Sequence, residues 1–69
     1  MKNSFAKNIK ALRTEEGCTQ AELGKLLNVT QRKVSYWENG SVEPDLDTLC
    51  QLADFFRVTV DELIGHENE

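Results

Sequence analysis

The stretch TQRKVSYWENG, residues 30–40, gathers side chains that donate and accept hydrogen bonds within one short segment. Gln31, Arg32 and Lys33 stand side by side, and Tyr36 follows about one helical turn later. A helix exposed only to water has no need of the aromatic ring, and a fully buried helix would not carry adjacent cations. We therefore expect this segment to present a polar surface to a binding partner.

No residues with the chemistry of a catalytic or metal site accompany this segment. The single histidine, His66, lies in the polar C-terminal tail, Cys18 and Cys50 are far apart, and no CxxC pair is present. A structural zinc site takes four ligands at short spacings, and nucleophilic catalysis needs a base beside its nucleophile. We expect no enzyme activity, no metal, no cofactor and no small-molecule ligand.

Charge is divided unevenly along the chain, whose net charge is −4. Residues 1–40 carry seven Lys or Arg against four Glu, a net +3, whereas residues 41–69 carry one Arg against eight Asp or Glu, a net −7. Attraction to a polyanion depends on the local field and not on the sum. The division fits a basic binding surface in the first half, and it equally fits two halves that are merely solvated.

The length of 69 residues predicts one domain over 1–69, with a core over about 4–65 and an acidic tail at 66–69. Apolar runs such as Leu26-Leu27 and Phe55-Phe56 are far shorter than a membrane span. The N-terminal charges are followed by no apolar stretch of the kind found in signal peptides. We expect a cytoplasmic protein without a membrane segment.

Capping residues and helix-ending residues divide the chain into five predicted helices. The expected N-caps are Ser4, Thr19, Thr30, Asp45 and Thr59, and the expected ends are Gly17, Asn28, Gly40 and Gly65. Glu22 and Glu62 complete capping boxes with the threonines three residues before them. Apolar residues at helical spacing follow the caps: Phe5, Ile9 and Leu12; Leu23, Leu26 and Leu27; Val34 and Trp37; Leu46, Leu49, Leu52, Ala53 and Phe56; Leu63 and Ile64. No alternating run supports a strand, so the predicted fold class is all-α.

The second and third predicted helices, 20–27 and 31–39, are joined by residues 28–30 alone. So short a link favours a sharp crossing over a relaxed hairpin. Asn28 tolerates the positive φ that such a turn commonly requires. Gly24 costs its helix about 1 kcal/mol relative to alanine, which is explained if the partner helix crosses so closely that even a small side chain would clash. We interpret the pair as a helix-turn-helix, with an ordinary helical hairpin in a bundle as the alternative.

The stretch from Leu12 to Leu63 resembles the lambda-repressor-like helix-turn-helix family (Cro/C1-type, XRE), which includes Cro and the phage repressors. The matching residues are Arg13, Gly17, Thr19-Gln20-Ala21-Glu22-Leu23-Gly24, Val29, Thr30, Val34, Trp37-Glu38-Asn39-Gly40, Pro44, Leu49, Leu52, Ala53, Val58 and Leu63. The sequence departs from the family pattern in two places. Gly24 stands where alanine is more common, and Asn28 stands where glycine is usual.

The resemblance implies a compact five-helix DNA-binding domain whose third helix enters the major groove. With Val34 and Trp37 toward the core, the residues expected to face outward are Gln31, Arg32, Ser35 and Tyr36. Glutamine pairs with adenine and arginine with guanine, while serine and tyrosine bond bases or phosphates. We predict that these four side chains contact bases. The alternatives are that Tyr36 merely covers the region of Trp37, and that Arg32 and Lys33 are solvated charges without a base contact.

The resemblance also implies contacts to the phosphate backbone and one ion pair inside the domain. The predicted phosphate contacts are Gln20, Thr30, Lys33, Asn39 and Ser41. Gln20 opens the second helix, where amide groups and the helix dipole favour an anion. Arg13 and Glu38 match a pair that joins the first and third helices in the family, so we assign them a structural role.

The function expected from these residues is a sequence-specific regulator of transcription, most plausibly a repressor, that binds a palindromic operator in double-stranded DNA as a homodimer. The region 55–64, together with Leu46, holds more apolar surface than one small core needs, and we predict the dimer contact there. The alternative is that Leu46, Phe55, Phe56, Val58 and Val60 are all buried within one chain. A second possible function is a protein-interaction module that binds another regulator through the acidic half.

Overall fold

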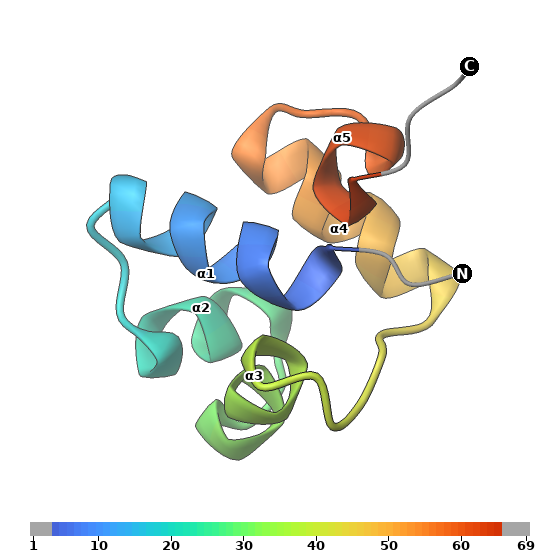
Figure 1. Ribbon diagram of the computed structural model, residues 1–69. Coiled ribbons are helices and arrows are strands. Elements are labelled where there is room, and N and C mark those ends of the chain that lie inside the picture. Colours follow the sequence, from blue (N-terminus) through green and yellow to red (C-terminus); the bar gives the residue numbers. More distant parts are fainter. Residues whose placement is uncertain (1–3, 66–69) are drawn as a thin grey trace.

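The computed structural model describes residues 4–65 and contains five helices and no strand in that range. The helices are α1 (Phe5–Glu15), α2 (Gln20–Leu27), α3 (Gln31–Glu38), α4 (Leu46–Phe56) and α5 (Val60–Ile64). Figure 1 shows α2 and α3 on one side of α1, with α4 and α5 on the other side. The all-α prediction with five helices is confirmed. The predicted acidic tail and His66 lie outside the described residues.

Side-chain caps fix the starts of four helices at the residues that the sequence predicts. The hydroxyl oxygens of Thr19 and Thr59 accept hydrogen bonds from the amides of Glu22 and Glu62, and both glutamates complete their capping boxes. Thr30 caps α3 by accepting from the Lys33 amide, and Asp45 caps α4 by accepting from the Thr48 amide. These bonds satisfy amide groups that the first turn of a helix leaves unpaired.

Ser4 directly precedes α1 as predicted, but the prediction that its side chain caps the helix is wrong. Its side chain makes no capping hydrogen bond, and its backbone has φ −107° and ψ 23°, outside the extended conformation of the other caps. The Ser4 amide instead donates to the carbonyl oxygen of Ile64 at 2.7 Å. This bond ties the start of α1 to the end of α5, and it holds Ser4 away from a capping geometry.

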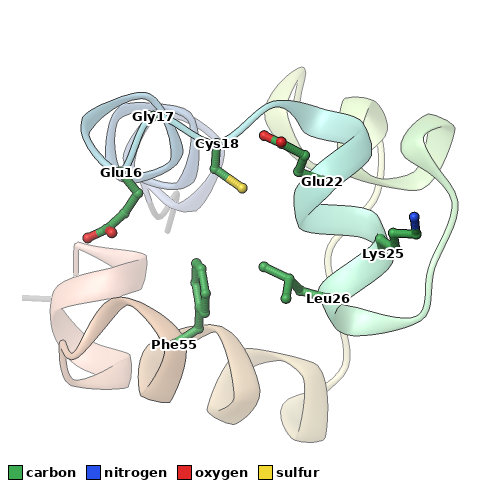
Figure 2. Close-up of a pocket in the computed structure, with 7 residues that line it drawn as sticks. All are labelled: Glu16, Gly17, Cys18, Glu22, Lys25, Leu26 and Phe55. Atoms are coloured by element: carbon green, nitrogen blue, oxygen red, sulfur yellow. The ribbon is translucent and has the colours of Figure 1, made fainter.

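The core gathers apolar side chains from all five helices. Its buried members are Phe5, Ile9, Leu23, Val34, Trp37, Leu52, Ala53, Phe56 and Leu63. Phe5 and Trp37 meet edge to face, with ring centroids 6.5 Å apart. Two residues of the predicted apolar stripes are exposed, Leu26 at 60% and Leu46 at 69%. The stripe residues that are only partly buried pack against the core: Leu12, Leu27, Leu49 and Ile64. Leu46 is the first residue of α4, before its buried face begins, and Leu26 lies on the side of α2 that faces α4 (Figure 2).

The corner between α2 and α3 has the geometry that its residues predict. Asn28 adopts the left-handed conformation, with φ 61° and ψ 41°, and ends α2. A Cβ atom added to Gly24 would lie 2.7 Å from the carbonyl oxygen of Val29 and 3.2 Å from the carbonyl carbon of Thr30. The close approach to Gly24 therefore comes from the backbone of the corner itself and not, as predicted, from the partner helix. Backbone atoms cannot rotate out of the way as a side chain would. The helix-turn-helix interpretation is confirmed.

Gly24→Ala is expected to destabilise the protein, although alanine is the better helix former by about 1 kcal/mol. Forcing a methyl group against rigid backbone typically costs about 1–3 kcal/mol, so the clash outweighs the gain in propensity. Thermal unfolding followed by circular dichroism measures the sign. Lys25→Ala, at the exposed neighbouring position, is the control and should change the melting temperature little. A higher melting temperature for Gly24→Ala would contradict the close approach.

Arg57 ends α4 in the left-handed conformation, with φ 60°, and no feature of the sequence predicted it. A non-glycine residue there costs about 1–2 kcal/mol. Arg57→Gly is therefore expected to raise the free energy of unfolding by about 1 kcal/mol, which corresponds to about 4–8 °C in a domain of this size. Arg57→Ala removes the same charge but keeps Cβ, so it should give no such gain. If both variants raise the melting temperature equally, the gain comes from the removed charge and not from the left-handed backbone conformation.

No helix within residues 4–65 is both long and apolar enough to cross a membrane.

Candidate nucleic-acid interface

From Gln31 to Tyr36, one face of α3 presents polar side chains to solvent, and buried residues on the opposite face anchor the helix in the core. Gln31, Arg32 and Lys33 are exposed and Ser35 is partly exposed. Tyr36 keeps 42% of its surface exposed. Val34 and Trp37 are buried on the opposite face, at 0% and 1% exposure. These side chains face outward, as predicted from the sequence. The role of each one in binding stays a prediction.

The predicted phosphate contacts lie on both sides of this helix face. Thr30 is exposed at the α3 cap, and Asn39 and Ser41 are exposed after the helix ends. The Oδ1 atom of Asn39 accepts a hydrogen bond from the Ser41 amide at 2.9 Å. That bond leaves the Asn39 amino group as a donor toward solvent, and it leaves Ser41 only its hydroxyl for an outside contact.

A chain of hydrogen bonds connects the first residue of α3 to the interior. Gln31 donates from Nε2 to Oε1 of Gln20 at 3.4 Å, and Gln20 donates from Nε2 to Oε1 of Glu38 at 3.0 Å. Because Glu38 is an acceptor, the Gln20 amide must turn its own oxygen toward Gln31. Gln31 is then left with its side-chain oxygen and one N–H available to a partner. Gln20 is therefore placed to orient the Gln31 side chain. Its own contact with a phosphate stays a prediction.

Arg13 and Glu38 form a two-point ion pair that joins α1 to α3. The distances are 2.6 Å from Arg13 Nε to Glu38 Oε2 and 3.1 Å from Nη2 to Oε1. Only 14% of the Arg13 side chain and 5% of the Glu38 side chain are exposed. Arg13 Nη1 also donates to the carbonyl oxygen of Cys18 at 2.8 Å, which fixes the turn before α2. The pair thus holds α1, the α1–α2 turn and α3 together, as its predicted structural role requires.

The surroundings of this pair raise the pKa of Arg13 and lower the pKa of Glu38, so that the charged form of each partner is favoured. The hydrogen bond to Glu38 raises the pKa of Arg13 above its ordinary value. Burial works to raise the pKa of Glu38, but hydrogen bonds from Arg13 and Gln20 and the charges of Arg13 and Lys10 outweigh it, so the pKa lies below its ordinary value. Glu38 is therefore a carboxylate in the folded protein at neutral pH.

This lowered pKa predicts a dependence of stability on acid. A carboxyl group whose pKa is lower in the folded state contributes stability that is complete above its unfolded value of about 4.3 and is lost as the pH falls through the folded value. The free energy of unfolding should therefore fall below about pH 4.3, and Glu38→Gln should flatten that part of the profile. Urea unfolding from pH 7 to pH 3 measures it. An unchanged acid limb in the variant would show that Glu38 does not cause the loss.

A hollow of about 390 Å³ lies between the end of α1 and the start of α2, with Thr14, Gln20, Ala21 and Gln31 among its lining residues. The amides of Glu22 and Leu23 are bonded to Thr19, which leaves the amides of Gln20 and Ala21 at the head of the helix. Such a helix start favours an anion. Thr14 and Ala21 were not among the predicted contacts, because their place beside Gln31 depends on how α1 and α2 pack against α3.

Arg32 and Lys33, the cations on this surface, form no ion pair within residues 4–65. The ion pair in that range joins Arg13 to Glu38. The charge of Lys33 reaches Asp45, whose pKa is lowered mainly by hydrogen bonds from Thr48 and to a smaller extent by Lys33. The acidic half of the chain thus begins beside the interface without covering it. Within the same residues, no group of three or more His, Cys, Asp or Glu side chains is placed to hold a metal ion.

Comparison with known proteins assigns the family. A helix-turn-helix family model matches residues 9–63, well over half of the chain. The chain belongs to the Cro/C1-type helix-turn-helix family. Its relatives include the HTH-type transcriptional activator BcrR of Enterococcus faecalis, which is 36% identical over 91% of this chain and 31% of BcrR. The chain spans between 31% and 56% of the length of the first three curated relatives it matches.

Two solved structures agree with the family assignment. A transcriptional regulator from Listeria innocua has a TM-score of 0.94 and 36% identity, over all of this chain and 64% of that one. The P22 c2 repressor, solved in complex with a synthetic operator, has a TM-score of 0.83 and 28% identity, over 91% of this chain and 96% of the repressor. These neighbours confirm the helix-turn-helix fold as a lambda-repressor-like one.

Proposed function

We propose that this chain, a member of a family of DNA-binding transcriptional regulators, binds specific sequences of double-stranded DNA by inserting α3 into the major groove. The observation that carries the proposal is the face of α3. Its polar side chains are exposed from Gln31 to Tyr36, while Val34 and Trp37 anchor the helix in the core. A fixed row of donors and acceptors on a helix of this kind fits base edges, which the major groove displays in a pattern unique to each base pair.

In this proposal the base contacts come from Gln31, Arg32, Ser35 and Tyr36. The hydrogen bond from Gln31 to Gln20 favours adenine, because it leaves one acceptor and one donor in the side-by-side arrangement that adenine pairs with. Arg32 is exposed and presents the fork of donors that matches guanine. Tyr36 and Ser35 lie one turn further along the helix and bond either bases or phosphates.

Phosphate contacts from both ends of the helix-turn-helix fix the register of α3 on the duplex. Gln20 and the free amides at the head of α2 form one group, and the hollow beside them gives an anion access. Thr30, Lys33, Asn39 and Ser41 form the other group, with Asn39 already oriented by its bond to Ser41. Among these contacts Lys33 is the cation, and each phosphate that a Lys or Arg side chain neutralises releases counterions, so affinity should fall as salt concentration rises.

We propose repression as the regulatory outcome and a homodimer as the active form, bound to half-sites about 34 Å apart. Val58, Val60 and Ile64 are only partly buried at the corner of α4 and α5, which supports a dimer contact within 55–64. Phe56 is buried in the core of one chain and contributes nothing to this surface, contrary to its prediction as part of the apolar surplus. The alternative that every apolar residue of this region is buried is also wrong, because Leu46 and Phe55 are exposed. A cytoplasmic location, where an operator would be found, belongs to the same proposal.

Selection from a pool of random double-stranded oligonucleotides tests the function. The expected result is an enriched motif of two inverted half-sites. The logarithm of the affinity should fall linearly with the logarithm of salt concentration, at about −0.9 for each phosphate that a Lys or Arg side chain neutralises. A protein-interaction module, the second candidate, is favoured by the net −7 of residues 41–69. That function would give weak retention of DNA and no motif, and this outcome would overturn the proposal.

A further inference from the structure

An apolar groove separates α2 from α4, away from the face of α3. Two adjoining hollows of about 460 Å³ and 400 Å³ form it, and Leu26 and Phe55 line both. Figure 2 shows Cys18, Leu26 and Phe55 directing their side chains into one space between the two helices. Leu26 is 60% and Phe55 is 38% exposed, so this surface is open to solvent in the single chain. Each hollow is large enough to hold apolar side chains of a partner.

The floor of this groove is uncharged. Burial raises the pKa of the Cys18 thiol above its ordinary value, so the thiol stays protonated at neutral pH and acts as a small apolar group. Leu27 extends the floor into the second hollow. Phe55 contacts the buried Phe56 edge to face, with ring centroids 4.9 Å apart, so one side of the Phe55 ring packs on the core while the rest faces the groove.

The rim of the groove carries an excess of negative charge. Glu16, Glu22 and Asp54 line it, and the only cation that lines either hollow is Lys25. No carboxylate of the three is recorded in an ion pair within residues 4–65. An apolar floor with an acidic rim complements an apolar stripe that is flanked by basic side chains.

We propose that the groove between α2 and α4 binds an amphipathic helix of another protein, one whose apolar stripe is bordered by Lys or Arg. Such helices insert residues at spacings of three and four into grooves lined by apolar side chains. A second copy of this chain is disfavoured in the same groove, because symmetric pairing would set one acidic rim against another. None of the predicted base or phosphate contacts lines the groove, so the helix and DNA would bind together and the chain would recruit a partner to its operator.

The test uses a synthetic helical peptide of about 18 residues with leucines at i, i+3, i+4 and i+7 and lysines beside them, titrated into the ¹⁵N-labelled chain. A scrambled peptide of equal composition is the control. The expected result is chemical-shift change at residues 16–18, 22–27 and 51–55, with the helical peptide bound at least about tenfold more tightly than the scrambled one.

Matched variants assign the contact. Leu26→Ser should weaken peptide binding about tenfold, whereas Leu46→Ser, at the other highly exposed leucine, should leave it unchanged. The double variant Glu16→Lys with Asp54→Lys should weaken binding of the lysine-bearing peptide, and neither residue takes part in a capping box. Both leucines are exposed, so the variants should keep the wild-type circular dichroism spectrum.

Three outcomes would overturn this inference. They are equal binding of the scrambled peptide, indifference to Leu26→Ser, and self-association of the chain that Leu26→Ser abolishes, which would assign the groove to a second copy. DNA affinity measured on the same variants separates this inference from the proposed function. Leu26→Ser should bind DNA like the wild type, and a chain that binds the peptide but no specific DNA would refute only the proposed function.

Discussion

Replacing Glu38 with alanine is expected to lower the free energy of unfolding by about 3–5 kcal/mol. The substitution leaves the Arg13 guanidinium largely buried without its partner, and it also removes the acceptor of the Gln20 side chain. A domain of this size has a total stability of about 3–5 kcal/mol, so the variant should be largely unfolded at 37 °C. Urea or thermal unfolding followed by circular dichroism gives the measurement.

Two further variants separate the lost ion pair from a general effect of charge. Glu43→Ala removes a glutamate at an exposed position and should leave the melting temperature nearly unchanged. Replacing both partners, as Arg13→Met with Glu38→Leu, should recover much of the stability, because no unpaired charge then remains. An unchanged melting temperature for Glu38→Ala would show that the ion pair does not hold α1 and α3 together. The hydrogen bonds from Gln31 through Gln20 to Glu38 would then contribute nothing to stability.

Arg32→Ala is expected to relax the base preference at one position of the DNA site by about 1–3 kcal/mol, a loss of about 5-fold to 150-fold in discrimination. Its exposed guanidinium is the side chain of α3 best suited to guanine. The measurement is oligonucleotide selection on the variant, followed by fluorescence anisotropy with the wild-type site and with each single-base change.

Lys33→Ala is the matched control, because it removes a cation at the adjacent position of the same helix turn. If Lys33 contacts phosphate, the variant binds all sequences more weakly by a similar factor, and the salt slope falls by about one unit. Neither variant should change the melting temperature much, since both side chains are exposed. The reverse pattern, with specificity lost in Lys33→Ala and a uniform loss in Arg32→Ala, would contradict the assignment of base and phosphate contacts.

Local features of the sequence predicted the parts of the fold that local chemistry determines. The capping boxes at Thr19 and Thr59 need only a hydroxyl and a carboxylate three residues apart, so their sequence pattern is sufficient. Gly24 and Asn28 are the residue types that a close approach and a left-handed turn require. Arg57 shows the limit, because it takes the same left-handed conformation although its residue type does not favour it.

The contacts between distant segments were less accessible from the sequence. The outward face of α3 followed from placing Val34 and Trp37 inward, but the bonds from Gln31 through Gln20 to Glu38 depend on three side chains from two helices. Leu26 was placed on an apolar stripe by its spacing, and only the position of α4 shows that it lines a groove with Phe55. Helical periodicity predicts which side of a helix is apolar, whereas it does not predict whether another element covers that side.

The central claim is that the outward face of α3 and the residues flanking it form the DNA contact. Nuclear magnetic resonance titration of the ¹⁵N-labelled chain with a selected duplex locates that contact directly. We predict that the amide shifts change at residues 20–21, 30–36 and 39–41, and that those of α4 and α5 change little except at a dimer contact within 55–64. Shift changes confined to the acidic α4 and α5, with the amides of α3 unaffected, would contradict the claim.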